Sequence, residues 1–388
     1  MEKKHLTARF SFLQGAYFAV FSVCSGFLSI LLQDAGVLTH QIGTMQAVLC
    51  FACALAQPIM GILCDKYQAN RIIYMAGAVA APILFYIIAR TQNKAVLVVT
   101  VFFIGMFINS LQSMGEGWVA NLNHFGAKIN FGATRGVGSF VYSFAVLFMG
   151  VIYNRFGGGA FAWILIILGA VQIVAAYVIP KPIPVHSQTK ISTKEALGVL
   201  VKNKKYCVFV FCYLLTFFPM AAFMTYFPLL FTQLGGSAGG VGIAFFIMSI
   251  GELPMMFLYK RFESKLGVEK MFIISCFGHA AKSICVALSG SLALAIVFSV
   301  FQVLGFALSI PCAQSYVEKI VEAKYAATAQ LVCATVALSI GQILGNLLAG
   351  VLSKAVGVSG TLFLTGLIPL GGIVIFIIAQ KLLLKSKS

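Results

Sequence analysis

Runs of about 20 apolar residues recur along the whole chain, and they constrain its fold more than any other feature. A helix needs about 20 such residues to cross a membrane. Twelve runs of this kind lie near residues 10–33, 41–63, 72–90, 95–120, 132–153, 159–179, 206–231, 239–259, 271–289, 292–315, 327–352 and 361–380. Because 60% of the 388 residues are apolar and only 10% are charged, a water-soluble domain is excluded. The sequence predicts an all-α integral membrane protein with twelve transmembrane helices in two six-helix halves.

A longer connection divides these spans into six and six. Residues 181–205 contain prolines and a cluster of lysines, whereas the other connections are short. We expect an N-terminal six-helix bundle over residues 1–180, a cytoplasmic linker over residues 181–205 and a C-terminal six-helix bundle over residues 206–388. Because so little sequence lies outside the spans, the function must lie within the bilayer. This organisation is typical of secondary transporters, whose site lies near the membrane midplane between the halves.

The distribution of charge predicts the orientation. The chain has 27 Lys and Arg residues against 10 Asp and Glu residues, and basic residues concentrate in cytoplasmic loops of membrane proteins. With both termini inside, the outer loops hold only Arg90, Lys94, Arg155 and Lys354. We therefore predict a multi-pass protein of the cell (plasma or inner) membrane with both termini cytoplasmic. The basic excess is then explained by the lipid bilayer, and no nucleic acid is expected as a partner.

No pattern in the sequence predicts a metal, a cofactor or an enzyme. All ten cysteines lie within or at the ends of apolar runs, so they are expected to be small buried hydrophobic residues. The stretch Gly235–Gly239 fits the serine-hydrolase elbow pattern. That elbow needs a strand, a turn and a helix with His and acid partners, whereas this stretch is a short outer loop with neither nearby.

Two ionisable residues lie near the middle of predicted spans, Glu252 in the eighth and Lys282 in the ninth. A charge at this depth costs about 2.5–3.5 kcal/mol on insertion scales, so it needs a partner or a watery cavity. The two residues therefore form either a structural ion pair or part of a pathway for substrate or protons. His279 lies three residues before Lys282 on the same helix face, so it is a further candidate for carrying a proton or for packing.

Two more ionisable residues, Glu116 and Arg135, lie at facing ends of the fourth and fifth spans. A salt bridge across the turn between these spans would satisfy both without a ligand. Gln112 lies one turn before Glu116, and Tyr142 lies two turns after Arg135 on the same face. A carboxylate, a guanidinium, an amide and a ring together suit a hydroxylated or carboxylated organic molecule.

The segment between the second and third spans resembles the loop signature of the major facilitator superfamily. It reads Gln57-Pro-Ile-Met-Gly-Ile-Leu-Cys-Asp-Lys66, with an arginine following. By this resemblance the fold is the major facilitator fold, and the loop residues form a cytoplasmic gate. The gate residues are Gly61, Asp65, Lys66 and Arg71.

A second set of residues is similar to the oligosaccharide/proton symporters of the lactose permease type and to the related phenylpropionate-permease group. It comprises the run Phe131–Ser139, the preceding Glu116 and the later Gly251-Glu252-Leu253. The resemblance covers nearly the whole chain. It implies that the substrate is bound by Gln112, Glu116, Arg135, Tyr142 and Glu252. Gln302, in the middle of the tenth span, is a further candidate for substrate binding. Tyr142 would take the place of the family's sugar-stacking Trp.

The chain departs from this family where the family handles protons. The His and Glu of the tenth helix become Gln302 and Gly305, and the Lys of the eleventh helix becomes Leu338. Lys282 stands where the permease has an Arg involved in proton handling. The coupling candidates are Glu252, Lys282 and His279, and uncoupled facilitated diffusion remains the alternative to proton symport.

The sequence thus predicts a secondary transporter that imports a small polar organic solute by alternating access. A saccharide or glycoside is the expected solute, with protons as the expected coupling ion. The alternative solute is an aromatic carboxylate of the phenylpropionate type, for which Arg135 and Lys282 would supply the cationic ends. A membrane-embedded enzyme is the competing class.

Overall fold

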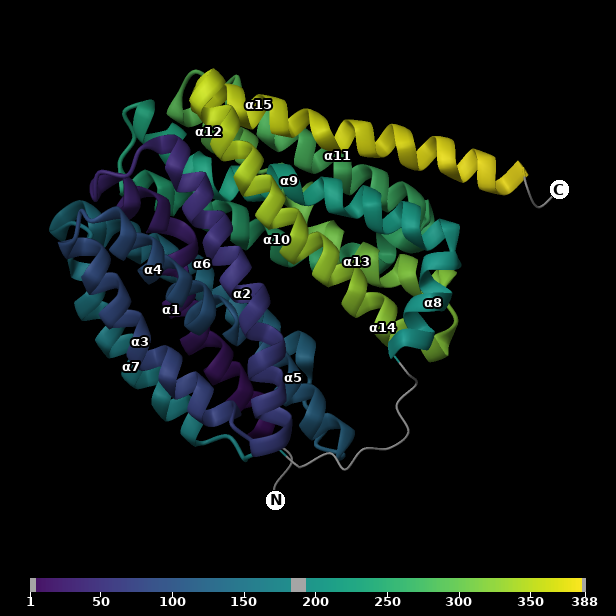
Figure 1. The fold of residues 1–388 in the computed structure, drawn as a ribbon, viewed down its shortest axis with the longest axis horizontal. Helices are drawn as coiled ribbons and strands as arrows, with labels where there is room; N and C mark the ends of the chain where they lie inside the picture. Colours follow the sequence, from purple (N-terminus) through teal and green to yellow (C-terminus); the bar gives the residue numbers. More distant parts are fainter. Residues whose placement is uncertain (1–4, 183–192, 386–388) are drawn as a thin grey trace. The chain divides into compact units, whose positions relative to one another are not determined.

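The computed structural model describes residues 5–182 and 193–385, and within these ranges the chain forms only helices and their connections. The N-terminal elements are α1 (Leu6–Asp34), α2 (Thr39–Tyr67), α3 (Asn70–Arg90), α4 (Lys94–Ile104), the π-helix η2 (Gly105–Asn109), α5 (Leu111–His124), α6 (Phe131–Phe156) and α7 (Ala160–Tyr177). The later elements are α8 (Thr193–Lys202), α9 (Lys204–Gln233), α10 (Ala238–Leu266), α11 (Val268–Ala287), α12 (Leu292–Ser299), α13 (Gln302–Ile320), α14 (Ala323–Ala334), the π-helix η3 (Thr335–Gly341) and α15 (Gln342–Lys385) (Figure 1).

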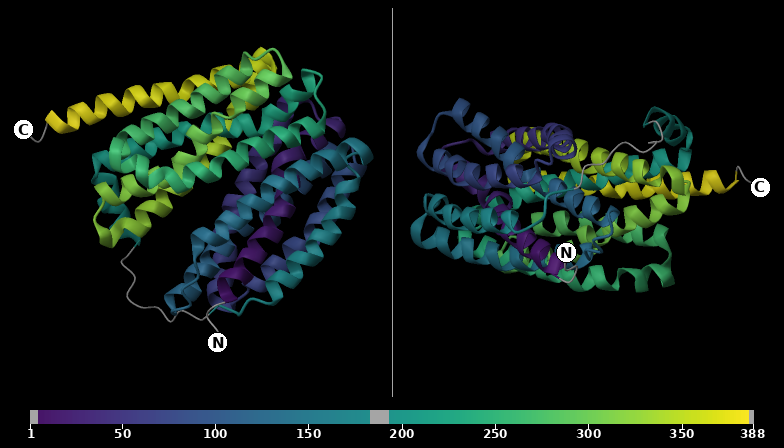
Figure 2. Two further views of the ribbon diagram at one scale, coloured as in Figure 1. Left: turned by 180° about the vertical axis from the view of Figure 1, so that it is seen from behind. Right: turned by 90° about the horizontal axis from the view of Figure 1, so that it is seen from below.

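Within the described residues, 11 helices are long and apolar enough to cross a membrane. The last of them, Ala323–Leu382, has 60 residues and contains both of the final two predicted spans. The backbone leaves the helical region inside it at Gly357, where φ is 73°. A glycine adopts this φ without a steric penalty, so the chain can turn here between the predicted spans 327–352 and 361–380. Figure 2 shows the ribbon, with this C-terminal part in yellow, from two further sides. The predicted all-α membrane architecture is confirmed.

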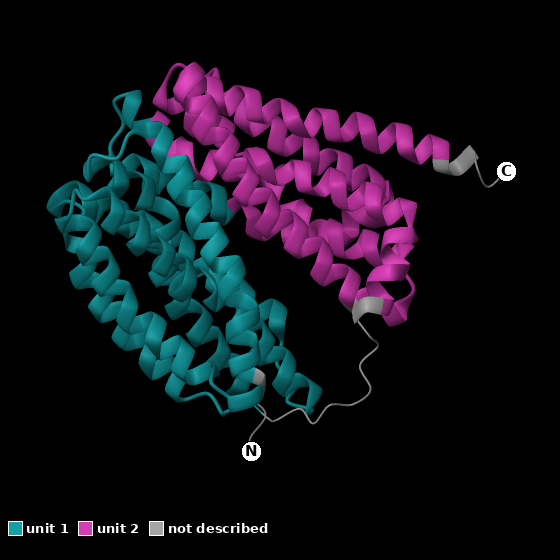
Figure 3. Cartoon of the chain, viewed as in Figure 1, with its two compact units in different colours: residues 1–186, 231–250 teal, residues 187–230, 251–388 magenta. Residues whose placement is uncertain are grey.

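The described helices form two compact units (Figure 3). Unit 1 comprises Met1–His186 with Phe231–Ile250, and unit 2 comprises Ser187–Leu230 with Gly251–Ser388. Residues 231–250 thus lie with the N-terminal helices, whereas the sequence placed them in the second half. The predicted halves and their boundaries remain a proposal.

The segment predicted as a linker contains a helix, α8. Ala196 and Leu200, one turn apart, are buried in the hydrophobic core of unit 2. This helix was not predicted, because a ten-residue helix next to prolines and lysines carries no sequence signal as strong as that of a membrane span.

Unit 1 is built around α1 and an aromatic core. Trp118 of α5 is fully buried, and its ring centroid lies 5.6 Å from that of Phe10 of α1 in an edge-to-face arrangement. Helices α3 and α7 lie side by side (Figure 1). A Cβ at Gly169 of α7 would lie 2.6 Å from the carbonyl oxygen of Ala78, so a glycine is required at this helix contact.

Unit 2 has its own aromatic core and an equally close helix contact. The rings of Phe209 and Tyr316 have centroids 4.4 Å apart in the core. Helices α11 and α13 approach so closely that a Cβ at Gly278 would lie 2.4 Å from the backbone nitrogen of Gly305. Because Gly305 lies three residues after the start of α13, this contact brings the first turn of α13 beside α11.

Candidate functional site

A carboxylate and a guanidinium from two successive helices meet in unit 1. Arg135 Nη1 of α6 donates to Glu116 Oε1 of α5 at 3.1 Å. The turn between the helices is held by Asn123, which accepts from the backbone of Ile129 at 2.5 Å and donates to its carbonyl at 2.9 Å. The side chain of Glu116 is 40% exposed and that of Arg135 is 20% exposed, so the pair is open to a ligand.

The amide of Gln112 lies against this pair. In one orientation its nitrogen donates to Glu116 Oε1 at 3.3 Å. In the reverse orientation its oxygen accepts from both terminal nitrogens of Arg135, at 2.6 and 3.1 Å. The structure therefore brings Gln112, Glu116 and Arg135 together as one polar cluster.

Aromatic side chains border the same cluster. The guanidinium carbon of Arg135 lies 5.1 Å from the centre of the Phe18 ring, within cation–π range. Tyr142 lies next to this ring, with centroids 6.3 Å apart, and 6.2 Å from that of Phe21. Its hydroxyl accepts from Ser25 of α1 at 3.1 Å. Tyr142 thus lies near the charged pair.

A second polar cluster lies in unit 2, where three helices contribute one residue each. Lys282 Nζ of α11 donates to Gln302 Oε1 of α13 at 2.5 Å. Gln302 Nε2 donates in turn to Glu252 Oε1 of α10 at 2.8 Å. The glutamine therefore bridges the two charged residues that the sequence analysis expected to interact across helices.

The ammonium group of Lys282 is fully buried and lies 4.1 Å from the centre of the Phe223 ring of α9. A buried ammonium group loses its hydration, and the ring face and the amide oxygen replace part of it. Removing one of these contacts would leave a poorly compensated charge in the interior of unit 2.

His279 is fully buried but has different partners. Its Nε2 lies 3.0 Å from the hydroxyl of Ser309, which lies 2.7 Å from that of Ser275. Among the described residues, Nδ1 of His279 has no hydrogen-bond partner. No hydrogen bond is found between His279 and Lys282 in this part of the chain, so a shared helix face did not make them one group.

The clusters show no arrangement for a metal. Within residues 5–182 and 193–385, no three His, Cys, Asp or Glu side chains are grouped closely enough to hold a metal ion. What both clusters offer instead are carboxylate, amide and cationic groups that form hydrogen bonds to polar organic molecules.

Sequence similarity extends over most of the chain and decides its family. Residues 9–364 match the MFS_1 like family. The chain belongs to this family. It is therefore a multi-pass membrane transporter of the major facilitator superfamily for a small-molecule substrate and not an enzyme, and the predicted likeness to oligosaccharide/proton symporters is confirmed at the family level.

Two curated relatives of this MFS_1 like transporter are themselves transporters. The maltose permease of Geobacillus stearothermophilus is 23% identical over 368 residues, which are 94% of this chain and 92% of that protein. The uncharacterized transporter YwbF of Bacillus subtilis (strain 168) is 26% identical over 244 residues. That alignment spans 63% of this chain and 60% of YwbF.

Solved structures with the same fold include the nucleoside transporter NupG, with a TM-score of 0.78 and 17% identity. The superposition covers 98% of this chain and 100% of NupG. A bacterial homolog of the human lysosomal transporter Spinster has a TM-score of 0.70 at 13% identity, and the superposition covers 99% of this chain and 98% of the homolog. At these identities the likeness concerns the fold, and the predicted major facilitator fold is confirmed.

The loop residues of this MFS_1 like transporter are placed within unit 1. Arg71 donates to the carbonyl of Ile179 at 2.6 Å and lies over the Tyr177 ring at 5.0 Å. It therefore binds the end of α7.

The other gate residues have fewer described contacts. Lys66 lies 5.2 Å from the centre of the Tyr67 ring. A Cβ at Gly61 would meet no described atom within 4 Å. The side chain of Asp65 lies outside the described set, and the gate role of these four residues remains a prediction.

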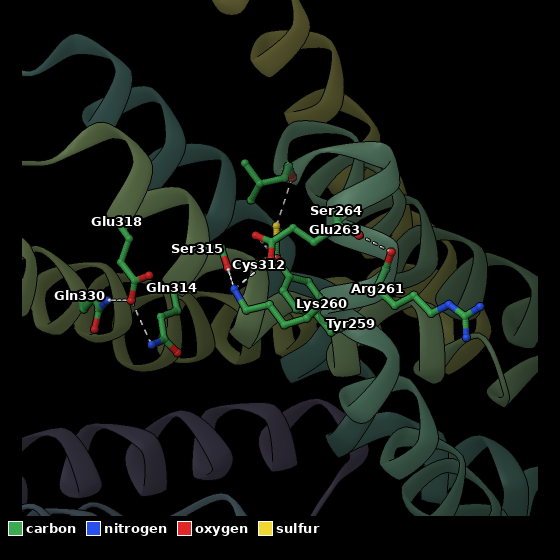
Figure 4. Close-up of polar contacts among 11 residues, drawn as sticks. Tyr259, Lys260, Arg261, Glu263, Ser264, Cys312, Gln314, Ser315, Glu318 and Gln330 are labelled. Atoms are coloured by element: carbon green, nitrogen blue, oxygen red, sulfur yellow. Dashed lines mark hydrogen bonds and ion pairs between the residues drawn. The ribbon is translucent and has the colours of Figure 1, made fainter.

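A polar network that the sequence analysis did not single out joins α10, α13 and α14 (Figure 4). Lys260 Nζ lies 2.9 Å from Glu263 Oε2 and 3.2 Å from the Ser315 hydroxyl. Glu318 accepts from Gln314 at 3.1 Å and from Gln330 at 3.3 Å. These contacts connect helix ends in unit 2 and lie apart from the two clusters described above.

The aromatic partners of the two cations were also missed. Phe18 and Phe223 contact Arg135 and Lys282, yet nothing distinguishes either from the other members of a set of 35 phenylalanines. Their position on α1 and α9 is informative only once the helix packing is known.

Proposed function

We propose that this protein imports a neutral saccharide or glycoside. The charge balance of the two clusters carries the proposal. Glu116 pairs with Arg135 at 3.1 Å, and Lys282 is linked through Gln302 to Glu252. Each cluster contains one cation and one carboxylate, so neither offers an excess charge to an ionic solute.

A hydroxyl-rich solute fits such clusters because each hydroxyl both donates and accepts. The carboxylate of Glu116 accepts from solute hydroxyls, and the fork of Arg135 donates two parallel hydrogen bonds. Tyr142 would cover an apolar sugar face with its ring. Gln112 adds an amide that both donates and accepts. In unit 2, Gln302 and Glu252 offer an amide and a carboxylate of the same chemistry, joined by a hydrogen bond of 2.8 Å.

The sequence relatives support the same solute class. The curated relative that matches 94% of this chain is a maltose permease. An aromatic carboxylate would need a cation without a carboxylate beside it. Arg135 is already paired with Glu116 at 3.1 Å, so this cluster favours a carboxylate solute less than a neutral one. That solute class is therefore the alternative outcome of the experiment below.

We further propose that uptake is coupled to protons through Glu252. This carboxylate lies in the hydrogen-bonded series that includes Gln302 and the buried Lys282. A proton on Glu252 would change the net charge of this cluster from zero to +1. The cluster would then alternate between an ionised and a protonated form of Glu252 during the transport cycle. We also propose that both termini lie in the cytoplasm, which the distribution of basic residues among the loops supports.

The decisive experiment measures the thermal stability of the detergent-purified protein with sugars, glycosides, nucleosides and aromatic acids. A solute at 100 times its dissociation constant adds about 2.7 kcal/mol to the stability of the folded state. We expect a shift with a saccharide or glycoside that Glu116→Gln removes and the matched control Glu318→Gln retains. A shift only with aromatic acids would replace this proposal by the carboxylate permease.

A further inference from the structure

The helix α8 lies at one end of unit 2 and takes no part in the two polar clusters (Figure 1). One side of it is fixed to the unit. Ala196 and Leu200 are buried in the core, and the carboxylate of Glu195 accepts from the Tyr325 hydroxyl at 3.1 Å. These contacts hold α8 beside the start of α14.

Another side of α8 presents apolar side chains outward. Leu197 and Val201, one turn apart, are 38% and 73% exposed. An exposed apolar edge of this kind, on the side of α8 that points away from the core of unit 2, indicates contact with something other than water.

The adjoining helix α9 shows what this edge faces. Lys204, Cys207 and Phe211 lie at helical spacing along one exposed stripe of α9. Phe211 is 48% exposed in a helix long and apolar enough to cross a membrane, and Lys204 lies about 10 Å along the axis from it. If Phe211 contacts acyl chains, this spacing brings Lys204 to the depth of the lipid headgroups. Cys207 Sγ donates to the carbonyl of Val201 at 3.3 Å, which places Val201 beside the stripe.

Three lysines surround the junction of the two helices. Lys202 and Lys204 are exposed and Lys205 is half-buried. Within the part of the chain that the structure describes, none of the three forms an ion pair. Their charges are therefore available to an anionic surface, next to apolar side chains at the level where α9 enters the membrane.

We propose that α8 and the first turn of α9 form an interfacial anchor for anionic phospholipid. Lys202, Lys204 and Lys205 bind the headgroup phosphates, while Val201 and Leu197 enter the edge of the acyl layer. The combination of a positive cluster and an apolar edge at the mouth of a span fits a lipid surface better than an acidic protein, which would leave the apolar edge uncovered. With the predicted orientation, the surface is that of the cytoplasmic leaflet.

The depth of Val201 is tested with a tryptophan placed there. In a Trp163→Phe background, which keeps only the buried Trp118, Val201→Trp is compared with Lys202→Trp in phosphatidylcholine/phosphatidylglycerol vesicles. Brominated acyl chains should reduce the fluorescence of the Val201→Trp protein much more than that of the Lys202→Trp protein, and aqueous acrylamide should show the reverse order. Equal quenching of both by acrylamide, with no loss from brominated lipid at position 201, would overturn the proposal.

The headgroup contact is tested by removing the charges together. Adding phosphatidylglycerol to the full-length protein in detergent should raise its melting temperature more than phosphatidylcholine does. The triple Lys202→Gln, Lys204→Gln, Lys205→Gln variant should lose this difference. A matched triple variant with Lys94, Arg155 and Lys354 changed to Gln, at the predicted outer face, should keep the difference in melting temperature between the two lipids. An undiminished difference in the first triple variant would contradict the anchor, whatever the transported solute is.

Discussion

Lys282 donates a hydrogen bond to Gln302 over 2.5 Å, from a position that is fully buried in unit 2. The lysine reaches Glu252 through this neutral amide, so a residue without charge organises the two charged ones. The close backbone contact of Gly278 with Gly305 brings the helices of the lysine and the amide together. The amide is therefore the residue on which the arrangement of this cluster depends.

Replacing Gln302 by leucine should destabilise the protein. The change removes the amide oxygen that accepts from the buried Lys282, and the loss of a hydrogen bond to a buried charged group costs about 1–3 kcal/mol. Unfolding in mixed detergent micelles measures this loss. Gln330→Leu, which removes an amide from the exposed Glu318, is the control and should change the stability by about 0.5 kcal/mol or less. Equal free energies of unfolding in the two variants would show that the Gln302 bridge does not stabilise the protein by this amount.

Removing the Glu116–Arg135 pair should affect binding far more than stability. Because the carboxylate is 40% exposed, the pair should contribute about 0–1 kcal/mol to the folded state. Glu116→Gln and Arg135→Ala are each expected to abolish solute binding while the melting temperature of the empty protein hardly changes. Ligand-induced thermal shifts measure both quantities. Wild-type affinity in both variants would reduce the pair to a structural bridge.

Two substitutions of Tyr142 distinguish a stacking role of its ring from a hydrogen-bonding role of its hydroxyl. Its ring lies beside Phe18 and its hydroxyl accepts from Ser25. If the ring covers a sugar face, Tyr142→Phe should keep most of the affinity and Tyr142→Ala should lose about 0.5–1.5 kcal/mol of binding free energy or more. Titration calorimetry with the solute found in the stability screen measures this. A larger loss in Tyr142→Phe than in Tyr142→Ala is the result that contradicts a stacking role.

Glu252→Gln should uncouple transport from protons. The amide keeps the shape and the acceptor oxygen but cannot bind and release a proton. Lightly buffered vesicles should show alkalinisation outside during solute uptake by the wild type. The variant should exchange solute across the membrane without this pH change and without accumulation. Solute uptake by the wild type with no pH change would identify a facilitator, and Glu263→Gln serves as the control for a carboxylate outside the cluster.

Much of the site could be predicted where residues are close in sequence or chemically exceptional. Glu116 and Arg135 flank a short turn between antiparallel helices, so the connection alone brings them within reach. Charges inside apolar spans are costly, which is why Glu252 and Lys282 could be singled out as candidates that need a partner. The partner of His279 could not be predicted in this way, because the histidine forms its hydrogen bond with Ser309 on another helix.

The residues that could not be predicted are those whose role depends on a neighbour far along the chain. Gln302 was assigned to the substrate site, but its place between Lys282 and Glu252 needs three helices in register. Phe18 and Phe223 are ordinary apolar residues until packing sets each ring against a cation. The helix α8 is stabilised by the core of unit 2 and not by its own sequence.

The sequence by itself determined the all-α membrane class, the number of apolar runs and the set of costly charges, because the bilayer imposes span length and penalises ionised groups residue by residue. The tertiary structure decided which of these charges meet and through which amide. It also placed α8 beside the first turn of α9. Hydrogen bonds and ring contacts act over a few ångströms, so only the packing of distant helices creates them.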